Sequence, residues 1–277
     1  MSVPAEPSRR AALARRVGSS AVLIALVALA IFSQSPLFFS LVVTMFVGVA
    51  LFEFFALFRR GNIPVSPVFG LLLGVAIPIV VYLESGGTQS GEILFLVLAC
   101  FFLFILKFFR NDPQSLVGIS LTLFGVLYIS WFSSFLIKIR FLQGGVMWVT
   151  YLLTVTKAAD IGAYAVGSLF GRHPLAPHIS PKKSVEGLVA GLAASAGASL
   201  AFHGHLPYAF TAAHCAVLGL LIAIVGQIGD LSESLMKRFC QAKDSGAILP
   251  GMGGVMDVAD SVIFTAPIFY FHLRLYL

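Results

Sequence analysis

The side chains most able to do chemistry lie close together near the end of the chain. The stretch AKDSGAILPGMGGVMDVADS, residues 242–261, places one lysine, three aspartates and four glycines directly before a final apolar run. Carboxylates without His or Cys partners suit hard cations such as Mg²⁺, which binds a few carboxylates together with the oxygens of a substrate phosphate. Lysine and arginine side chains among those carboxylates would cancel the negative charge that a site for a cation alone needs. The two signs of charge together indicate a site for a metal ion and a polyphosphate.

More ionisable residues stand just before this stretch. Asp230 and Glu233 are three residues apart at the end of an apolar segment, and Lys237 and Arg238 follow one helical turn later. Asp257, at the start of the last apolar run, has a simpler explanation, because the helix dipole stabilises a carboxylate at a helix N-terminus. That explanation does not cover the four aspartates of the region together.

Several known site types are excluded by their missing motifs. The segment PGMGG can expose backbone N–H groups to phosphate, but the chain has no G-x-x-x-x-G-K-[ST] loop and is not a P-loop NTPase. It has no G-x-S-x-G motif, and its six histidines show no metal-ligand spacing. Three scattered cysteines predict no disulfide and no thiolate metal site.

The composition indicates what must hold these residues in place. Hydrophobic residues make up 58% and charged residues 11% of the 277 positions, whereas about 25% of a soluble domain is charged. Apolar stretches long enough to cross a bilayer fall at about 18–33, 38–58, 64–83, 91–109, 116–137, 146–168, 187–204, 209–229 and 257–276. The sequence predicts an all-α, polytopic membrane protein with about nine transmembrane helices. Its single domain, 1–277, is expected to combine scaffold helices over 1–145 with catalytic helices and loops over 146–277.

Basic residues in short loops predict the orientation of these helices. One side carries Arg9, Arg10, Arg15, Arg16, Arg59, Arg60, Lys107, Arg110, Arg172, Lys182, Lys183, Lys237, Arg238 and Lys243. The loops ESGGTQSGE and HGHLP of the other side contain no Lys or Arg, and only Lys138, Arg140 and Arg274 depart from the pattern. We therefore expect a cytoplasmic N-terminus and a site facing the cytoplasm, in a bacterial inner membrane. The net charge of +6 needs no nucleic-acid partner.

A charge inside a membrane helix costs at least ~2.5 kcal/mol, so Glu53, Lys157 and Asp160 each need an explanation. Glu53 lies about two turns before Arg59 and Arg60. We interpret it as a carboxylate near the interface that pairs with a basic residue, and a direct role is the alternative. Lys157 and Asp160 share a helix face and can pair. A buried ion pair and a cavity-lining role for Asp160 both stay open.

The loop GRHPLAPHISPKKSVEG, residues 171–187, joins two of the predicted helices. Its prolines stiffen the backbone, and Ser180, Lys182 and Lys183 offer hydrogen-bond donors and positive charge. The bias of basic residues toward cytoplasmic loops explains the positive charge. It does not explain why the lysine pair is flanked by serines in a proline-stiffened loop, and this arrangement favours a preformed phosphate site. Ser184 and Glu186 have the types that begin a helix.

The two charged regions together resemble the signature of the phosphatidate cytidylyltransferase (CDP-diacylglycerol synthase) family. The C-terminal block matches at Ser234, Lys237, Arg238, Lys243, Asp244, Pro250, Gly253, Gly254, Asp257 and Asp260. The upstream block matches at Asp160, Ala163, Tyr164, Gly167, Gly171, Pro177, Ser180, Pro181, Lys182, Lys183, Glu186 and Gly187. The chain departs from the family pattern at Met252, where His is usual, and at Val258, where Arg is usual.

The resemblance implies a Mg²⁺-dependent reaction of phospholipid biosynthesis, CTP + phosphatidate → CDP-diacylglycerol + pyrophosphate, by direct attack of the lipid phosphate on the α-phosphorus. Implied catalytic residues are Asp230, Lys237, Arg238, Lys243, Asp244, Asp257 and Asp260. Of these, Asp230, Asp257 and Asp260 are the expected metal ligands, and a second cation is left open. Implied substrate-binding residues are Asp160, Ser180, Lys182, Lys183, Ser234, Gly253 and Gly254. The expected partners are CTP, phosphatidate and the bilayer, and a homodimer is left open.

Two other functions remain as alternatives. A CTP-dependent kinase of a membrane lipid alcohol would release CDP in place of pyrophosphate. A transporter or channel would carry charges through the depth of the membrane and show internal symmetry. The charges of this chain cluster on one predicted side, and no internal repeat is evident.

Overall fold

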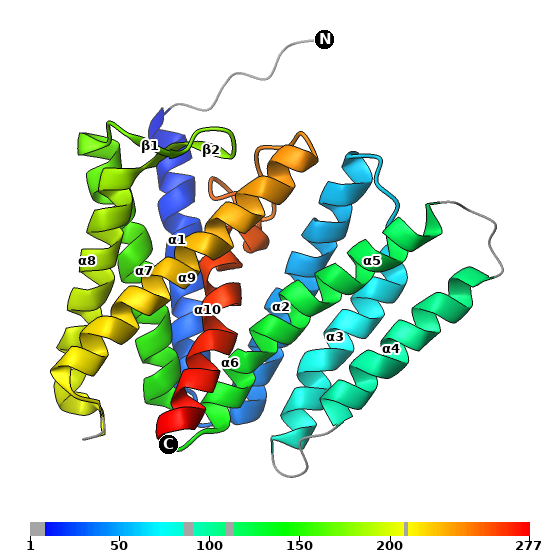
Figure 1. Cartoon of the computed structure of the whole chain (residues 1–277), viewed down its shortest axis with the longest axis horizontal. Coiled ribbons are helices and arrows are strands. Elements are labelled where there is room, and N and C mark those ends of the chain that lie inside the picture. Colours follow the sequence, from blue (N-terminus) through cyan, green and yellow to red (C-terminus); the bar gives the residue numbers. More distant parts are fainter. Residues whose placement is uncertain (1–8, 86–90, 109–113, 208–209) are drawn as a thin grey trace.

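The computed structural model describes residues 9–85, 91–108, 114–207 and 210–277 (Figure 1). Arg110, and residues 86–90 of the loop ESGGTQSGE, lie outside these ranges. The helices of the first half are α1 (Arg9–Phe32), α2 (Pro36–Arg60), α3 (Pro67–Glu84), α4 (Gly91–Phe108), α5 (Ser115–Gly125), the π-helix η1 (Val126–Trp131) and α6 (Phe132–Phe141). The second half contains α7 (Gly145–Phe170), β1 (Pro174–Ala176), β2 (Ser180–Ser184), α8 (Val185–Ala201), the 3₁₀ turn η2 (His203–His205), α9 (Ala212–Phe239) and α10 (Val255–Tyr276).

A helix covers most of each predicted membrane segment, with α5, η1 and α6 running on as one. Among the described residues, five helical segments are long and apolar enough to cross a membrane: Pro36–Arg60, Pro67–Glu84, Ser115–Phe141, Val185–His205 and Ala212–Phe239. The prediction of a helical, polytopic membrane protein is therefore confirmed at this coarser level. The small β1–β2 hairpin is the described departure from an all-α chain, and it forms where the proline-stiffened loop was expected.

The loops divide between the two ends of the bundle, as Figure 1 shows. The hairpin, the loop after α9 and the beginning of α1 share one end, here called the hairpin end, and the C-terminus lies at the other, the far end. Two basic residues that depart from the charge pattern have partners. Lys138 pairs with Glu92, and the Arg140 guanidinium donates to the Ser33 carbonyl at 3.0 Å.

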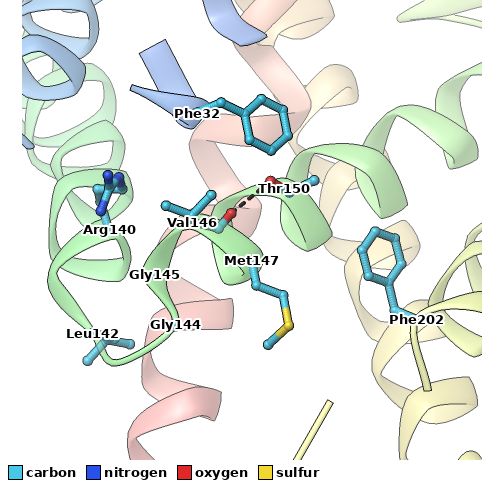
Figure 2. Close-up of a pocket in the computed structure, with 9 residues that line it drawn as sticks. All are labelled: Phe32, Arg140, Leu142, Gly144, Gly145, Val146, Met147, Thr150 and Phe202. Carbon is cyan, nitrogen blue, oxygen red and sulfur yellow. Dashed lines mark hydrogen bonds between the residues drawn. The ribbon is translucent and has the colours of Figure 1, made fainter. Parts of the chain in front are cut away.

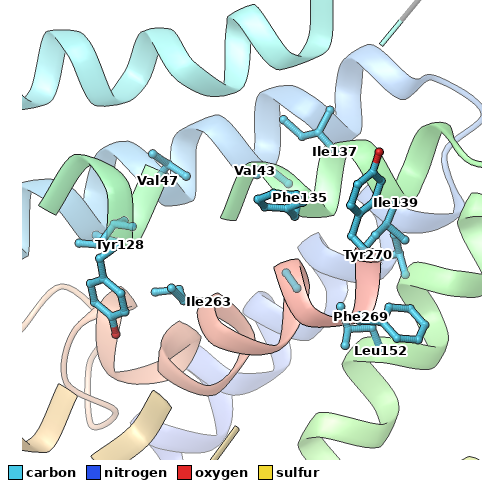
Figure 3. Close-up of a cluster of buried hydrophobic side chains, with 14 of the residues drawn as sticks. Val43, Val47, Tyr128, Phe135, Ile137, Ile139, Leu152, Ile263, Phe269 and Tyr270 are labelled. Atoms are coloured by element: carbon cyan, nitrogen blue, oxygen red, sulfur yellow. The ribbon is translucent and has the colours of Figure 1, made fainter. Parts of the chain in front are cut away.

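Aromatic and branched side chains join the two halves of the chain into one hydrophobic cluster (Figure 3). Phe135 of α6 packs on Tyr270 of α10, with ring centroids 5.3 Å apart. On the other face of α10, Phe269 stacks on Tyr151 of α7 at 5.3 Å. Helix α10 is therefore held from both sides, which fixes the place of the aspartates at its N-terminal end.

Small residues allow α7, α8 and α9 to approach one another closely. A Cβ added at Gly191 would lie 2.9 Å from the Ala159 carbonyl oxygen of α7, and one at Gly162 would lie 3.0 Å from the Ala190 oxygen of α8. Gly219 of α9 approaches the Ser195 carbonyl oxygen in the same way, at 2.8 Å. Because the obstacles are backbone atoms, these contacts cannot be relieved by a side-chain rotation.

Gly191→Ala is accordingly expected to destabilise the protein by about 1–3 kcal/mol, the usual range for overpacking. Gly197→Ala, on the same helix, is the matched control, because its added Cβ meets nothing within 4 Å. This control is expected to be neutral or stabilising by up to about 1 kcal/mol, since alanine is the better helix former. Thermal unfolding in detergent measures both variants. Equal melting temperatures for the two would contradict the close α7–α8 contact.

Candidate active site

Two helices bring carboxylates together near the hairpin end. A Cβ added at Gly229 would lie 2.6 Å from the Asp260 carbonyl oxygen, so α9 and α10 are nearly in backbone contact at this point. That contact places Asp230 and Glu233 of α9 beside Asp260 of α10. Each of the three offers a carboxylate oxygen within 4.8 Å of the others. Glu233 is 0% exposed and Asp260 is 6% exposed.

The chemistry of this cluster fits a hard divalent cation. One oxygen of Glu233 accepts from Lys237, while its Oε1 is buried and has no hydrogen-bond donor among the described residues. A buried carboxylate oxygen without a donor is costly unless a cation compensates for it. Three converging carboxylates supply the oxygen ligands that Mg²⁺ prefers, with room for substrate oxygens to complete the shell.

Lys237 connects this cluster to the glycine-rich loop. Its ammonium donates to Glu233 and to Asp257 Oδ1, both at 2.6 Å. The other oxygen of Asp257 accepts from the Ser245 backbone at 3.0 Å, the Ser245 hydroxyl at 2.7 Å and the Gly254 backbone at 2.7 Å. Both oxygens of Asp257 are therefore occupied by protein donors, and this carboxylate holds the loop against the start of α10.

Helix α7 and the hairpin supply the other charges of the site. Lys157 donates to Asp160 at 2.8 Å and to the Val258 carbonyl oxygen at 3.0 Å, so the predicted ion pair is present. On the opposite wall, Lys183 pairs with Asp230. Strand β2 carries Lys183 to this position, and Ser184 then caps α8 by accepting from the Gly187 N–H at 3.1 Å, as predicted.

These side chains line a cavity of about 650 Å³ between α7, α8, α9 and α10. Five carboxylates and four lysines lie on its wall: Asp160, Asp230, Glu233, Asp257, Asp260, Lys157, Lys182, Lys183 and Lys237. The remaining wall is largely apolar or small, and includes Tyr164, Leu188, Leu192 and Ile222. A charged region thus continues into an apolar one, which suits a molecule with a phosphorylated head and a hydrocarbon tail.

Comparison with known proteins shows which family this chain belongs to. The sequence pattern of the cytidylyltransferase family matches residues 14–276. The chain belongs to this family. It is 31% identical to a phosphatidate cytidylyltransferase of Synechocystis over 267 residues, covering 87% of this chain and 89% of the relative. It is 33% identical to the Bacillus subtilis phosphatidate cytidylyltransferase over 264 residues, covering 92% and 96%. An uncharacterised Escherichia coli protein is 38% identical over 157 residues, covering 57% and 52%.

The structure of this cytidylyltransferase-family chain does not bring all the predicted site residues to the cavity. Those that do not line it are Ser180, Ser234, Arg238, Lys243, Asp244, Gly253 and Gly254. Arg238 instead donates to the Ile179 and Ala242 carbonyls, both at 3.2 Å, which ties the hairpin to the loop after α9. Lys243 and Asp244 are exposed. Asp257 lines the cavity outside the group of three converging carboxylates, and its role as a metal ligand stays a prediction.

Three cavity residues were missed as site residues by the sequence reasoning. Glu233 belongs to the carboxylate cluster, and its spacing of three from Asp230 was the available signal. Lys157 was recognised as an ion-pair partner but not as part of the cavity wall. Gln227 lies one turn before Asp230, and its Nε2 is buried with no acceptor among the described residues. No feature of the sequence singles out that glutamine.

The two departures from the family signature lie differently in the structure. Met252 is outside the cavity lining, and its sulfur accepts a hydrogen bond from the Ser20 hydroxyl of α1 at 3.2 Å. Val258 brings no charge, but the Lys157 ammonium lies 3.0 Å from its carbonyl oxygen. A cation from α7 is therefore present next to position 258.

A second pocket, near the far end, has a different character (Figure 2). It is lined by Phe32, Arg140, Leu142, Gly144, Gly145, Val146, Met147, Thr150 and Phe202. Arg140 is its one ionisable residue, and the Thr150 hydroxyl donates to the Val146 carbonyl at 2.7 Å. No carboxylate is among its lining residues.

Proposed function

We propose that this protein transfers the cytidylyl group of CTP to phosphatidate, forming CDP-diacylglycerol and pyrophosphate. The observation that carries the proposal is the cavity, whose wall combines five carboxylates and four lysines with an apolar surface. Two relatives that bear the name of this activity match nearly the whole chain. The same charges could serve a lipid-alcohol kinase, but no described feature favours that reaction.

Asp230, Glu233 and Asp260 are the residues proposed to hold Mg²⁺. Bound there, the ion would neutralise charge on the triphosphate and polarise its phosphorus. This set replaces Asp257 with Glu233, because the oxygens of Asp257 already accept hydrogen bonds from Lys237, Ser245 and Gly254. A second cation stays open.

The lysines are proposed to bind the phosphate groups of both substrates, and the apolar wall is proposed to bind the acyl chains of phosphatidate. Lys183, which pairs with Asp230, and Lys237, which pairs with Glu233, are proposed to bind phosphate oxygens on either side of the reacting phosphorus. The acyl chains of phosphatidate are proposed to leave the cavity along α7 and α8, past Tyr164 and Leu188. The lipid phosphate is itself the nucleophile, so the protein contributes alignment and charge neutralisation.

The membrane arrangement follows from the same proposal. The hairpin end is proposed to face the cytoplasm of a bacterial cell, where CTP is available, with α1 to α10 forming nine spans of the inner membrane and the N-terminus inside. The division into scaffold helices before residue 145 and catalytic helices after it belongs to this proposal, and a homodimer remains compatible with it.

Purified protein in detergent, supplied with CTP, Mg²⁺ and phosphatidate, tests the reaction. Pyrophosphate and CDP-diacylglycerol are expected in equal amounts, and omission of phosphatidate is expected to stop the release of both. Release of CDP together with a phosphorylated alcohol would instead identify a kinase. Mn²⁺ can be used as a spectroscopic substitute for Mg²⁺ to show that the metal site is intact. If folded protein binds Mn²⁺ but forms neither product, the proposed reaction is rejected.

A further inference from the structure

The N-terminus of α10 lacks the cap that its position requires. The first N–H groups of a helix have no partner within the helix, and a polar side chain at the N-cap usually accepts from them. Here the N-cap is Gly254, which has no side chain. Asp257 reaches back to the Gly254 N–H at 2.7 Å, but Gly254 offers no side-chain acceptor to the N–H groups that follow it.

The missing acceptor comes from a distant part of the chain. Glu53 of α2, 203 residues away in sequence, accepts from the Met256 N–H through Oε2 at 2.9 Å. Its side chain is buried, with the residue 2% exposed. Among the described residues Glu53 pairs with no basic side chain, so it is not the interfacial ion-pair partner expected from the sequence. It acts on the backbone of α10.

Two glycines make room for this carboxylate. A Cβ added at Gly254 would lie 2.5 Å from Glu53 Oε2, and one at Gly246 would overlap Glu53 Oε1. The loop therefore closes around the Glu53 side chain. Ser245, next to Gly246, binds Asp257 through both its backbone and its hydroxyl. A carboxylate near a helix N-terminus also interacts favourably with the helix dipole.

We propose that Glu53 is a positioning residue that caps α10 from outside and thereby fixes where Asp260 enters the carboxylate cluster. Through this contact, a helix of the N-terminal half sets the geometry of a site built by the C-terminal half. The kinetic part of the inference rests on the proposed function, whereas its structural part does not.

Glu53→Gln and Glu53→Ala separate this role from direct chemistry. Glutamine keeps an oxygen that can accept from Met256, so the variant is expected to keep turnover and Mn²⁺ affinity within about threefold of wild type. Alanine removes the acceptor, and loss of a supporting contact of this kind typically weakens metal affinity or activity about 10- to 100-fold. The loss is expected in kcat and in Mn²⁺ affinity measured by electron paramagnetic resonance, with little change in the KM for CTP.

Glu84→Ala is the matched control. Glu84 of α3 accepts from the Glu92 N–H at 3.2 Å, so it too caps the start of a neighbouring helix, α4, away from the cavity. Amide hydrogen exchange, which needs no activity, is expected to rise across residues 254–258 in Glu53→Ala, and not in Glu53→Gln or Glu84→Ala. Wild-type protein that binds Mn²⁺ but makes no CDP-diacylglycerol would reject the proposed reaction and leave the exchange result standing.

Two results would overturn the inference. Unchanged exchange at residues 254–258 in Glu53→Ala would show that Glu53 does not hold α10. Glu53→Gln that loses activity as completely as Glu53→Ala, with normal exchange, would show that the charge of Glu53 takes part directly.

Discussion

Asp260→Asn is expected to reduce the release of pyrophosphate from CTP and phosphatidate by roughly 10³-fold or more. A divalent cation on a transferring phosphoryl group contributes several kcal/mol of transition-state stabilisation, and each 1.36 kcal/mol is tenfold in rate. Asp260 is 6% exposed and lies beside Asp230 and Glu233, so its charge is one of three that converge on the same point. Asparagine keeps the shape of the side chain and removes one of the three charges proposed to bind the cation.

The same change is expected to leave the fold intact or to make it more stable. Three converging carboxylates, of which Glu233 and Asp260 are buried, repel one another, and neutralising one of them relieves that repulsion. Thermal unfolding without metal should therefore give a melting temperature equal to or above that of wild type, while Mn²⁺ affinity falls. This opposite movement of stability and activity distinguishes a metal ligand from a residue that supports the fold.

Asp257→Asn provides the comparison, because it alters the other aspartate of the same motif. The oxygens of Asp257 accept from Lys237, Ser245 and Gly254, so its replacement is expected to lower stability and activity together. If Asp260→Asn lost stability and Asp257→Asn did not, the assignments of these two residues would have to be exchanged. Normal turnover and Mn²⁺ affinity in Asp260→Asn would contradict the proposed metal site.

Local spacing predicted which elements carry the site, because helical periodicity acts within one segment. The capping of α8 by Ser184 and the pairing of Lys157 with Asp160 follow from residues three apart. Apolar length likewise predicted a helix at each proposed span. These features depend on interactions whose partners are neighbours in the chain.

The contents of the site depend on tertiary contacts and could not be predicted in this way. Asp257 and Asp260 have equivalent positions in the motif. Nevertheless, Ser245 of the loop binds Asp257, whereas Asp230 of α9 lies beside Asp260. Their different surroundings arise from a helix crossing at Gly229. The partner of Glu53 is 203 residues distant, and no local pattern indicates it.

Lys237→Met is the second change with a large expected effect, and it acts on stability as well as on activity. The Lys237 ammonium lies 2.6 Å from both Glu233 and Asp257, whose side chains are only 1% and 12% exposed. Breaking a buried ion pair by removing one partner costs about 3–5 kcal/mol, because the other charge is left uncompensated. Methionine fills the space of the lysine chain, so the loss measures the charge and not a cavity.

Arg238→Met is the control that the chain itself offers, one residue further along α9. Arg238 is exposed and donates to two backbone carbonyls, and loss of such surface contacts usually changes stability by no more than about 1 kcal/mol. Thermal unfolding in detergent, with and without Mn²⁺, compares the two variants. Mn²⁺ is expected to restore part of the stability of Lys237→Met, because a cation among Asp230, Glu233 and Asp260 compensates the charge that the lysine balanced. A Lys237→Met protein as stable as Arg238→Met would show that the lysine is not needed to hold the carboxylates together, and its role would reduce to binding phosphate.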